Sequence, residues 1–236
     1  MSIPKVIHYC WFGGNPLPEL AAQCIESWKK FLPDYEIMRW DESNFDVNSI
    51  PYTAAAYNAR KFAFVSDYAR FRILYEHGGV YFDTDVEVIA RMDDVLEKGP
   101  YMGRENGHDV ASGLGMAAPA GLPFYREVLD YYEGLEFDTT TVVQHVTRLL
   151  EKHGLVESKD VETVAGINIY PESWFNPIST FDGILRLTPD TRTIHHFAQS
   201  WVSPSHRFFR KIALKILGPA NKRKLSDFLL NLRRKK

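Results

Sequence analysis

Hydrophobic positions in the first 40 residues follow first a strand pattern, then a helix pattern, then a strand pattern again. Residues 5–12 form a β-branched and aromatic run closed by the turn residues 13–16, which predicts a strand followed by a turn. From residue 18, apolar side chains recur at helical spacing until Leu32-Pro33, and residues 35–40 form a second strand-like run. This order indicates two parallel strands joined by a crossover helix, so the sequence predicts an α/β fold.

The following segment predicts a long helix that leads into a short buried strand. Residues 54–77 carry a broad apolar face, and the pair Gly78-Gly79 would end this helix because glycine tolerates left-handed torsions. Residues 80–82 are typical of a buried strand, whereas residues 110–125, interrupted by glycines and prolines, predict a loop-rich segment. Further helices are expected at 92–98, 124–134 and 142–153, and strands at 166–170, 185–188 and 193–197, with 86–90 extending the strand at 80–82.

Two acidic residues, Asp83 and Asp85, end the apolar run that opens on the glycine pair. In an extended backbone they project to the same side, roughly 6 to 7 Å apart, at the carboxyl end of a strand, where open α/β sheets bind ligands. An Asp-x-Asp triplet alone is more typical of a solvated turn. The buried strand before it favours a functional pair, because buried carboxylates repel one another unless a cation or hydrogen-bond donors compensate them.

Asp67 and Arg70 lie three residues apart on the predicted helix and therefore share one face. A surface salt bridge, worth at most ~1 kcal/mol, is the plain interpretation of such a pair. The pair lies on the predicted helix that directly precedes the two aspartates, which favours a role in the same site.

The charge of the chain is divided between an acidic body and a basic tail. Residues 206–236 hold 11 Lys and Arg and one acidic residue, a net charge of +10, so residues 1–205 carry −12 of the total of −2. Within the tail, residues 208–217 predict a helix with one apolar and one cationic face, which could lie on an anionic membrane or pack on the body. We expect one domain at 1–205, followed by the tail, and no nucleic-acid partner because the acidic body would repel one.

Composition adds little to this picture. With 236 residues and 45% hydrophobic side chains the chain can bury one substantial core. Cys10 and Cys24 show no zinc-site spacing, and the first residues do not have the charge and apolar pattern of a signal peptide. We therefore expect a cytoplasmic protein with reduced thiols, which the tail could attach to the inner face of the cell membrane.

Four blocks in order resemble one family, the DXD-containing sugar-binding glycosyltransferases. That family includes bacterial capsule and O-antigen transferases, yeast initiating mannosyltransferases and, more remotely, the glucosylating clostridial toxins. The resemblance covers residues 3–90 closely and resumes near 193–201, through the blocks 3–14, 66–70, 78–85 and 195–201. It implies a GT-A-like, Rossmann-type nucleotide-sugar-binding fold with a mainly parallel central sheet flanked by helices.

The resemblance also implies roles for individual residues. Trp11 would stack on a nucleobase, since an aromatic face suits any flat ring. Asp67 and Arg70 would bind the hydroxyls of the donor sugar and ribose, a role that suits a carboxylate and a guanidinium fork. The remaining expected donor-binding residues are Tyr81, Asp83, Ser200 and Trp201.

A divalent cation is the cofactor that the resemblance implies. Asp83 and Asp85 would hold Mn²⁺ or Mg²⁺ against the donor diphosphate, because hard cations prefer oxygen ligands. His195 and His196 point to opposite faces of an extended backbone, so only one can reach the site, and the resemblance favours His196 as the third ligand. The cation would stabilise the leaving nucleoside diphosphate.

The expected activity is a retaining, metal-dependent hexosyl transfer in surface polysaccharide synthesis. The donor would be a UDP-hexose, or less favourably GDP-mannose, and the acceptor a saccharide or a polyprenyl-linked saccharide, contacted by residues such as Glu105, Asp109 or Asp182. Two alternatives remain open. One is a phosphatase or glycoside hydrolase that uses the carboxylate pair; the other is a non-catalytic module that binds membrane or nucleic acid through its basic tail.

Overall fold

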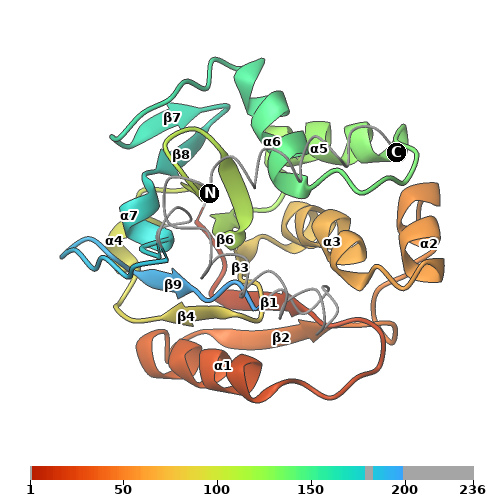
Figure 1. Ribbon diagram of the computed structural model, residues 1–236, viewed down its shortest axis with the longest axis horizontal. Helices are drawn as coiled ribbons and strands as arrows, with labels where there is room; N and C mark the ends of the chain where they lie inside the picture. The colour runs from red at the N-terminus through yellow and green to blue at the C-terminus, as the bar shows by residue number, and fades with distance from the viewer. Residues whose placement is uncertain (1, 179–182, 199–236) are drawn as a thin grey trace, which may run out of the picture.

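The computed structural model describes residues 2–178 and 183–198, which form a central sheet between two helical layers (Figure 1). The sheet has seven strands in the order β2-β1-β3-β6-β5-β8-β7. Strands β1, β2, β3, β5 and β8 run in one direction, and β6 and β7 run in the other. The predicted α/β fold with a mainly parallel sheet is confirmed.

The N-terminal unit follows the prediction closely. Strand β1 (Val6–Cys10) pairs in parallel with β2 (Glu36–Trp40), and helix α1 (Glu19–Phe31) makes the crossover between them. On its other side β1 pairs in parallel with β3 (Gly79–Tyr81). The carboxyl ends of β1 and β3 therefore meet at one edge of the sheet.

The predicted long helix is divided into two. Helix α2 (Pro51–Asn58) ends where Arg60 adopts a left-handed φ of 57° and Lys61 N–H donates to Ala56 O, 2.8 Å away. Helix α3 (Phe62–His77) then starts in a new direction and ends at Gly78, with φ of 66° as predicted. Apolar periodicity continues across the break because both helices pack on the same core.

Residues 110–118, within the segment 110–125 that was predicted to be loop-rich, form the longest strand among the residues that the structure describes. Strand β6 (Val110–Ala118) is buried along its whole length between β3 and β5 (Tyr101–Arg104). Its small side chains let neighbouring groups approach closely, and Gly115 has a φ of 123° where an added Cβ would lie 2.8 Å from the Phe82 ring. That prediction was wrong because glycine in a strand was taken as a turn signal, whereas it also marks close backbone approach.

Residues 86–88 form a strand of a separate two-stranded sheet. Strand β4 (Val86–Val88) pairs antiparallel with β9 (Thr193–His195), so it does not extend β3. The strand expected at 185–188 is reduced to one bridge between Ile178 and Leu185. The remaining described elements are α4 (Asp93–Leu96), α5 (Pro123–Glu133), α6 (Val142–Glu151), β7 (Glu162–Val164), β8 (Ile167–Tyr170) and α7 (Glu172–Phe175).

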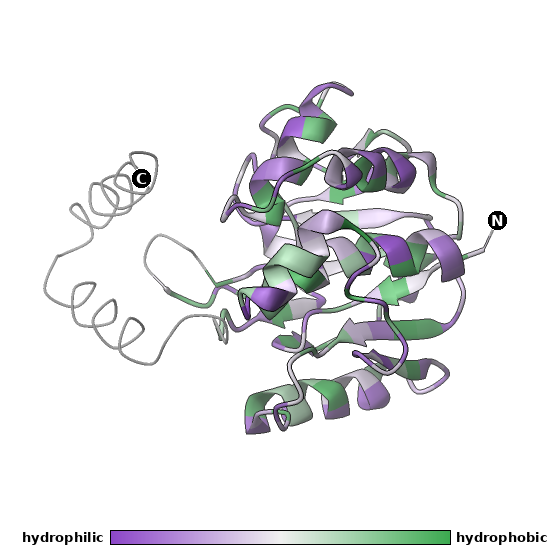
Figure 2. Cartoon of the chain, turned by 90° about the vertical axis from the view of Figure 1, so that its right-hand side faces the viewer, coloured by the Kyte–Doolittle hydropathy of each residue, from purple (hydrophilic) through white to green (hydrophobic). Residues whose placement is uncertain are grey.

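Two hydrophobic clusters lie on opposite faces of the sheet. One packs α2, α3, α5 and α6 on it, and the other packs α1, β4, α4 and α7. The helix ribbons of Figure 2 accordingly change between hydrophobic and hydrophilic residues along their length. Among the residues that the structure describes, no helix has the length and apolar content needed to cross a membrane.

Candidate active site

Asp83 and Asp85 lie in the tight connection between β3 and β4. The turn is closed by Val86 N–H, which donates to Asp83 O over 3.1 Å. The sequence predicted that the two aspartates project to one side of an extended strand. In the structure they lie beyond the end of β3, and it is the turn that brings their carboxylates together. Their position at the carboxyl end of β3 agrees with the prediction.

His195 completes a compact cluster with the two aspartates. One ligand atom from each of the three residues lies within 4.8 Å of the others. His195 Nε2 is 3.1 Å from Asp85 Oδ1, and the backbone N–H of Ala198 donates to Asp85 Oδ2 over 2.8 Å. The register of β9 on β4 pairs Val86 with His195 and so sets this imidazole beside the aspartates.

His196, the histidine predicted as the third ligand, lies on the other side of the chain. Its Nε2 contacts Glu87 Oε2 at 2.8 Å, away from the aspartate cluster. Strand alternation did allow only one of the two histidines to reach the site, but the structure places His195 there.

Substitution of each histidine should separate these two positions. We expect His195→Asn to weaken Mn²⁺ binding by roughly tenfold or more, since even partners of metal ligands contribute 10- to 100-fold. The matched change His196→Asn should alter the dissociation constant by less than about twofold. Calorimetric titration with Mn²⁺ measures both values, and a larger loss in the His196 variant would contradict the placement.

Arg70 connects the aspartate turn to helix α3 and to strand β6. Its Nη2 is 3.0 Å from both Asp67 Oδ1 and Asp83 Oδ1, and its Nη1 donates to Ser112 Oγ over 3.0 Å. The Arg70 side chain is 4% exposed and that of Asp67 11% exposed. The pair is therefore a buried part of the site and not a surface salt bridge.

Burial and ionic partners shift the acidic groups of the site in different directions. Burial raises the pKa of Asp67 to about 7 and outweighs the opposing effect of Arg70. Burial likewise raises the pKa of Asp83. For Asp85 burial acts in the same direction, but hydrogen bonds from His195 and Ala198 outweigh it and hold the pKa below its usual value. Asp85 is thus the carboxylate most strongly kept in its charged form.

The cluster has the composition and size of a divalent cation site. Two carboxylates and one imidazole suit Mn²⁺, and with water completing the coordination shell they suit Mg²⁺. One ligand atom from each of the three residues lies within 4.8 Å of the others, which is close enough for them to share one ion. The residues present therefore fit the group that the DXD resemblance implies.

The other predicted donor-binding residues differ in where they lie. Trp11 follows β1 at the site edge, is half-buried, and donates from Nε1 to Asn15 O over 2.7 Å. Tyr81 is only 1% exposed; its ring packs on Arg70 and its hydroxyl donates to Asp83 Oδ1 over 3.0 Å. Tyr81 therefore contacts other residues of the site and is itself buried. Ser200 and Trp201 lie outside the described residues, as do the tail at 206–236 and Asp182.

Sequence reasoning missed the contribution of β6. Ser112 binds Arg70, and Gly113 lies so close to Asp83 that an added Cβ would be 2.3 Å from Oδ2. The one available signal was the run of small residues after Val110, which was interpreted as a loop.

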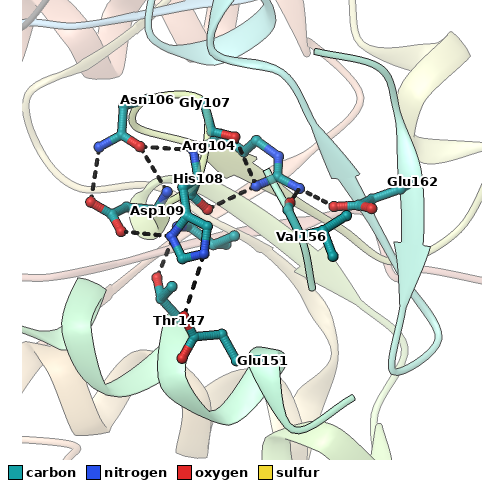
Figure 3. A network of polar contacts seen from close by, with 10 residues as sticks. Arg104, Asn106, Gly107, His108, Asp109, Thr147, Glu151, Val156 and Glu162 are labelled. Carbon is teal, nitrogen blue, oxygen red and sulfur yellow. Dashed lines mark hydrogen bonds and ion pairs between the residues drawn. The ribbon is translucent and has the colours of Figure 1, made fainter. Parts of the chain in front are cut away.

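A loop with a network of polar contacts follows the carboxyl end of β5 (Figure 3), a strand that runs in the same direction as β3. It connects β5 to β6, and its base is fixed by Arg104, which is fully buried and donates to His108 O over 2.8 Å, to Val156 O over 2.9 Å and to Glu162. Glu105 and Asp109, two of the predicted acceptor contacts, belong to this loop. The contacts of the buried Arg104 therefore fix the base of this loop.

Comparisons with known proteins find similarity to glycosyltransferases. Residues 18–101 match the family described as "Glycosyltransferase sugar-binding region containing DXD motif". Inositol phosphoceramide mannosyltransferase 3 of Schizosaccharomyces pombe is 30% identical over 132 residues, which cover 54% of this chain and 36% of that protein. Inositol phosphoceramide mannosyltransferase 1 of the same organism is 32% identical over 112 residues, covering 43% and 34%. The chain thus spans about a third of the length of these relatives.

Among solved structures, PaToxG glycosyltransferase has a similar fold. Its TM-score is 0.50 at 20% sequence identity, over 64% of this chain and 69% of that one. At this sequence identity the likeness concerns the fold alone. Residues 18–101 therefore match the DXD-containing sugar-binding region of glycosyltransferases, in agreement with the resemblance that the sequence blocks indicated.

Proposed function

We propose that this protein is a retaining, metal-dependent glycosyltransferase that moves a hexose from a nucleotide diphosphate sugar to a saccharide or lipid-linked saccharide acceptor. The observation that carries the proposal is the convergence of Asp83, Asp85 and His195 in one cluster. Arg70 joins that cluster to Asp67, so a cation site and a polyol-binding pair are adjacent.

In this proposal, different side chains of the site bind different parts of the donor. Asp83, Asp85 and His195 would hold Mn²⁺ or Mg²⁺, which when bound supplies positive charge to the leaving diphosphate. The carboxylate of Asp67 accepts hydroxyl hydrogens, and Arg70 keeps that carboxylate in place. Trp11 offers a ring at the mouth of the site for a nucleobase. No nucleophile is required if displacement proceeds on the front face with the leaving phosphate taking the acceptor proton.

The substrates follow from the family and its members. A UDP-hexose is the donor expected from the sequence. The two relatives are inositol phosphoceramide mannosyltransferases, which supports mannose, and therefore GDP-mannose, as the alternative donor. An acceptor carried on a lipid would agree with a tail at 206–236 that contacts an anionic membrane. We place the protein in the cytoplasm, at the inner face of the cell membrane, in surface polysaccharide synthesis.

The geometry supports transfer more than hydrolysis. Glycoside hydrolases place their two carboxyl groups about 5 to 5.5 Å or 6.5 to 9.5 Å apart, on two sides of the sugar. Here the ligand atoms of both aspartates lie within 4.8 Å of each other and of the same imidazole. Asp83 is also bound to Arg70, which favours a shared cation over separate acid and base roles.

A thermal-shift screen tests the proposal directly. We expect UDP or GDP to raise the unfolding temperature only when Mn²⁺ is present, because ligands stabilise the folded state according to their affinity. Incubation with the matching nucleotide sugar should then release the nucleoside diphosphate, and chelator should abolish that release. Stabilisation that is independent of metal, or turnover that persists in chelator, would contradict the proposal.

A further inference from the structure

Two residues of strand β6, Ser112 and Gly113, adjoin the aspartate turn without belonging to it. We propose that Ser112 is a positioning residue that fixes Asp83 through Arg70, and that Gly113 supplies the space in which the Asp83 carboxylate lies. This inference deepens the proposed function and rests on the assignment of Asp83 to the cation.

The guanidinium of Arg70 makes polar contacts through all three of its nitrogen atoms. Of its five N–H groups, Nε donates to Ser66 O over 3.1 Å, Nη1 donates to Ser112 Oγ, and Nη2 reaches both Asp67 and Asp83. The first contact uses a backbone atom, and both it and Asp67 belong to the helix that carries Arg70 itself. Ser112 is therefore the hydrogen-bond partner that connects the Arg70 fork to strand β6 of the sheet, beside the Tyr81 ring that packs on the guanidinium.

Rotation of that fork would move Asp83. Asp83 Oδ1 accepts from Arg70 Nη2 and from Tyr81 OH, each at 3.0 Å, so the guanidinium is one of the two groups that hold this oxygen. Ser112 is fully buried, and no water can readily replace a lost hydroxyl at a site without exposed surface. Loss of the Ser112 hydroxyl would therefore leave Nη1 without its partner and let the fork turn.

Gly113 lies next to the other oxygen of the same carboxylate. A Cβ at this position would lie 2.3 Å from Asp83 Oδ2 and 3.4 Å from Arg70 Nη1, well inside contact distance for the former. The φ of Gly113 lies outside the left-handed region, so the reason for glycine here is space and not backbone torsion. Any side chain at 113 would push Asp83 out of its place between Arg70 and the turn.

The test compares four variants of the full chain by Mn²⁺ titration. We expect Ser112→Cys, which keeps the volume but weakens the acceptor, and Ser112→Ala to raise the Mn²⁺ dissociation constant about tenfold, and Ser112→Thr, which keeps the hydroxyl, to restore it to within about threefold. Thr147→Val is the matched control, because Thr147 Oγ1 is a buried hydroxyl that accepts from Val110 N of the same strand over 3.0 Å and does not touch Arg70. It should lower the unfolding temperature without changing Mn²⁺ affinity.

Gly113→Ala gives an independent measurement and should weaken Mn²⁺ binding more than either Ser112 change. Gly134→Ala, where the nearest atom to an added Cβ is 3.9 Å away, should leave the affinity unchanged. Wild-type affinity in folded Ser112→Cys or Gly113→Ala would overturn the inference, as would equal losses in Ser112→Cys and Thr147→Val. If the wild-type protein binds Mn²⁺ with these differences but transfers no sugar, the proposed function fails while the positioning role stands.

Discussion

Replacing Asp85 by asparagine is expected to lower the rate of sugar transfer by on the order of 10³-fold. Asp85 is the carboxylate whose pKa is held below its usual value, and it faces His195 at 3.1 Å. Asparagine keeps the shape but removes the negative charge and one acceptor oxygen, so both cation affinity and charge stabilisation of the leaving group would be lost. Initial rates at saturating Mn²⁺, with nucleoside diphosphate release as the readout, measure the effect.

Glu87→Gln is the matched control for this change. Glu87 lies two residues further along the same segment, but its carboxylate contacts His196 and is half exposed. Its neutralisation should change the rate by less than about threefold, because exposed pairs contribute little. If both variants lost activity equally, a general loss of negative charge, and not cation binding by Asp85, would be responsible.

Replacing Arg70 by methionine is expected to reduce the free energy of unfolding by about 3 to 5 kcal/mol. The change leaves the buried Asp67 and the partly buried Asp83 without the guanidinium that lies 3.0 Å from each. For a chain of this length the unfolding temperature should fall by roughly 10 °C. Urea unfolding at pH 8 measures the loss.

The destabilisation should become smaller as the pH falls. Burial raises the pKa of Asp67 from 3.8 to about 7 even with Arg70 present, so the folded state binds this proton more tightly than the unfolded chain. Stability linked to such a group rises as pH falls from 7 towards 4, and it is lost as pH rises through the folded pKa. The difference between Arg70→Met and wild type should therefore be largest above pH 7.

The neighbouring arginine provides the control for stability. Arg72 pairs with Glu76 on the exposed side of the same helix, and Arg72→Met should cost less than about 1 kcal/mol at any pH. An equal loss of unfolding free energy in the two variants would show that the helix tolerates neither change. The buried cluster would then contribute no more to stability than the exposed pair.

Local sequence signals were sufficient for the elements that first define the sheet edge. The crossover from β1 through α1 to β2, the helix end at Gly78 and the strand before Asp83 were all predicted, because periodicity and glycine torsions act over a few residues. The family blocks added the residue types of the site. Asp67, Arg70, Asp83 and Asp85 are brought together as those blocks implied.

Long-range contacts decided what local signals could not. The burial of β6 depends on strands that flank it from distant parts of the chain, so its small residues and glycines have the same local pattern as a loop. Strand alternation shows that only one of His195 and His196 reaches the aspartates, but the register of β9 on β4, across more than 100 residues, selects His195. Likewise the charges of Asp67 and Arg70 follow from sequence, whereas their burial and the contact of Arg70 with Ser112 of β6 follow from packing.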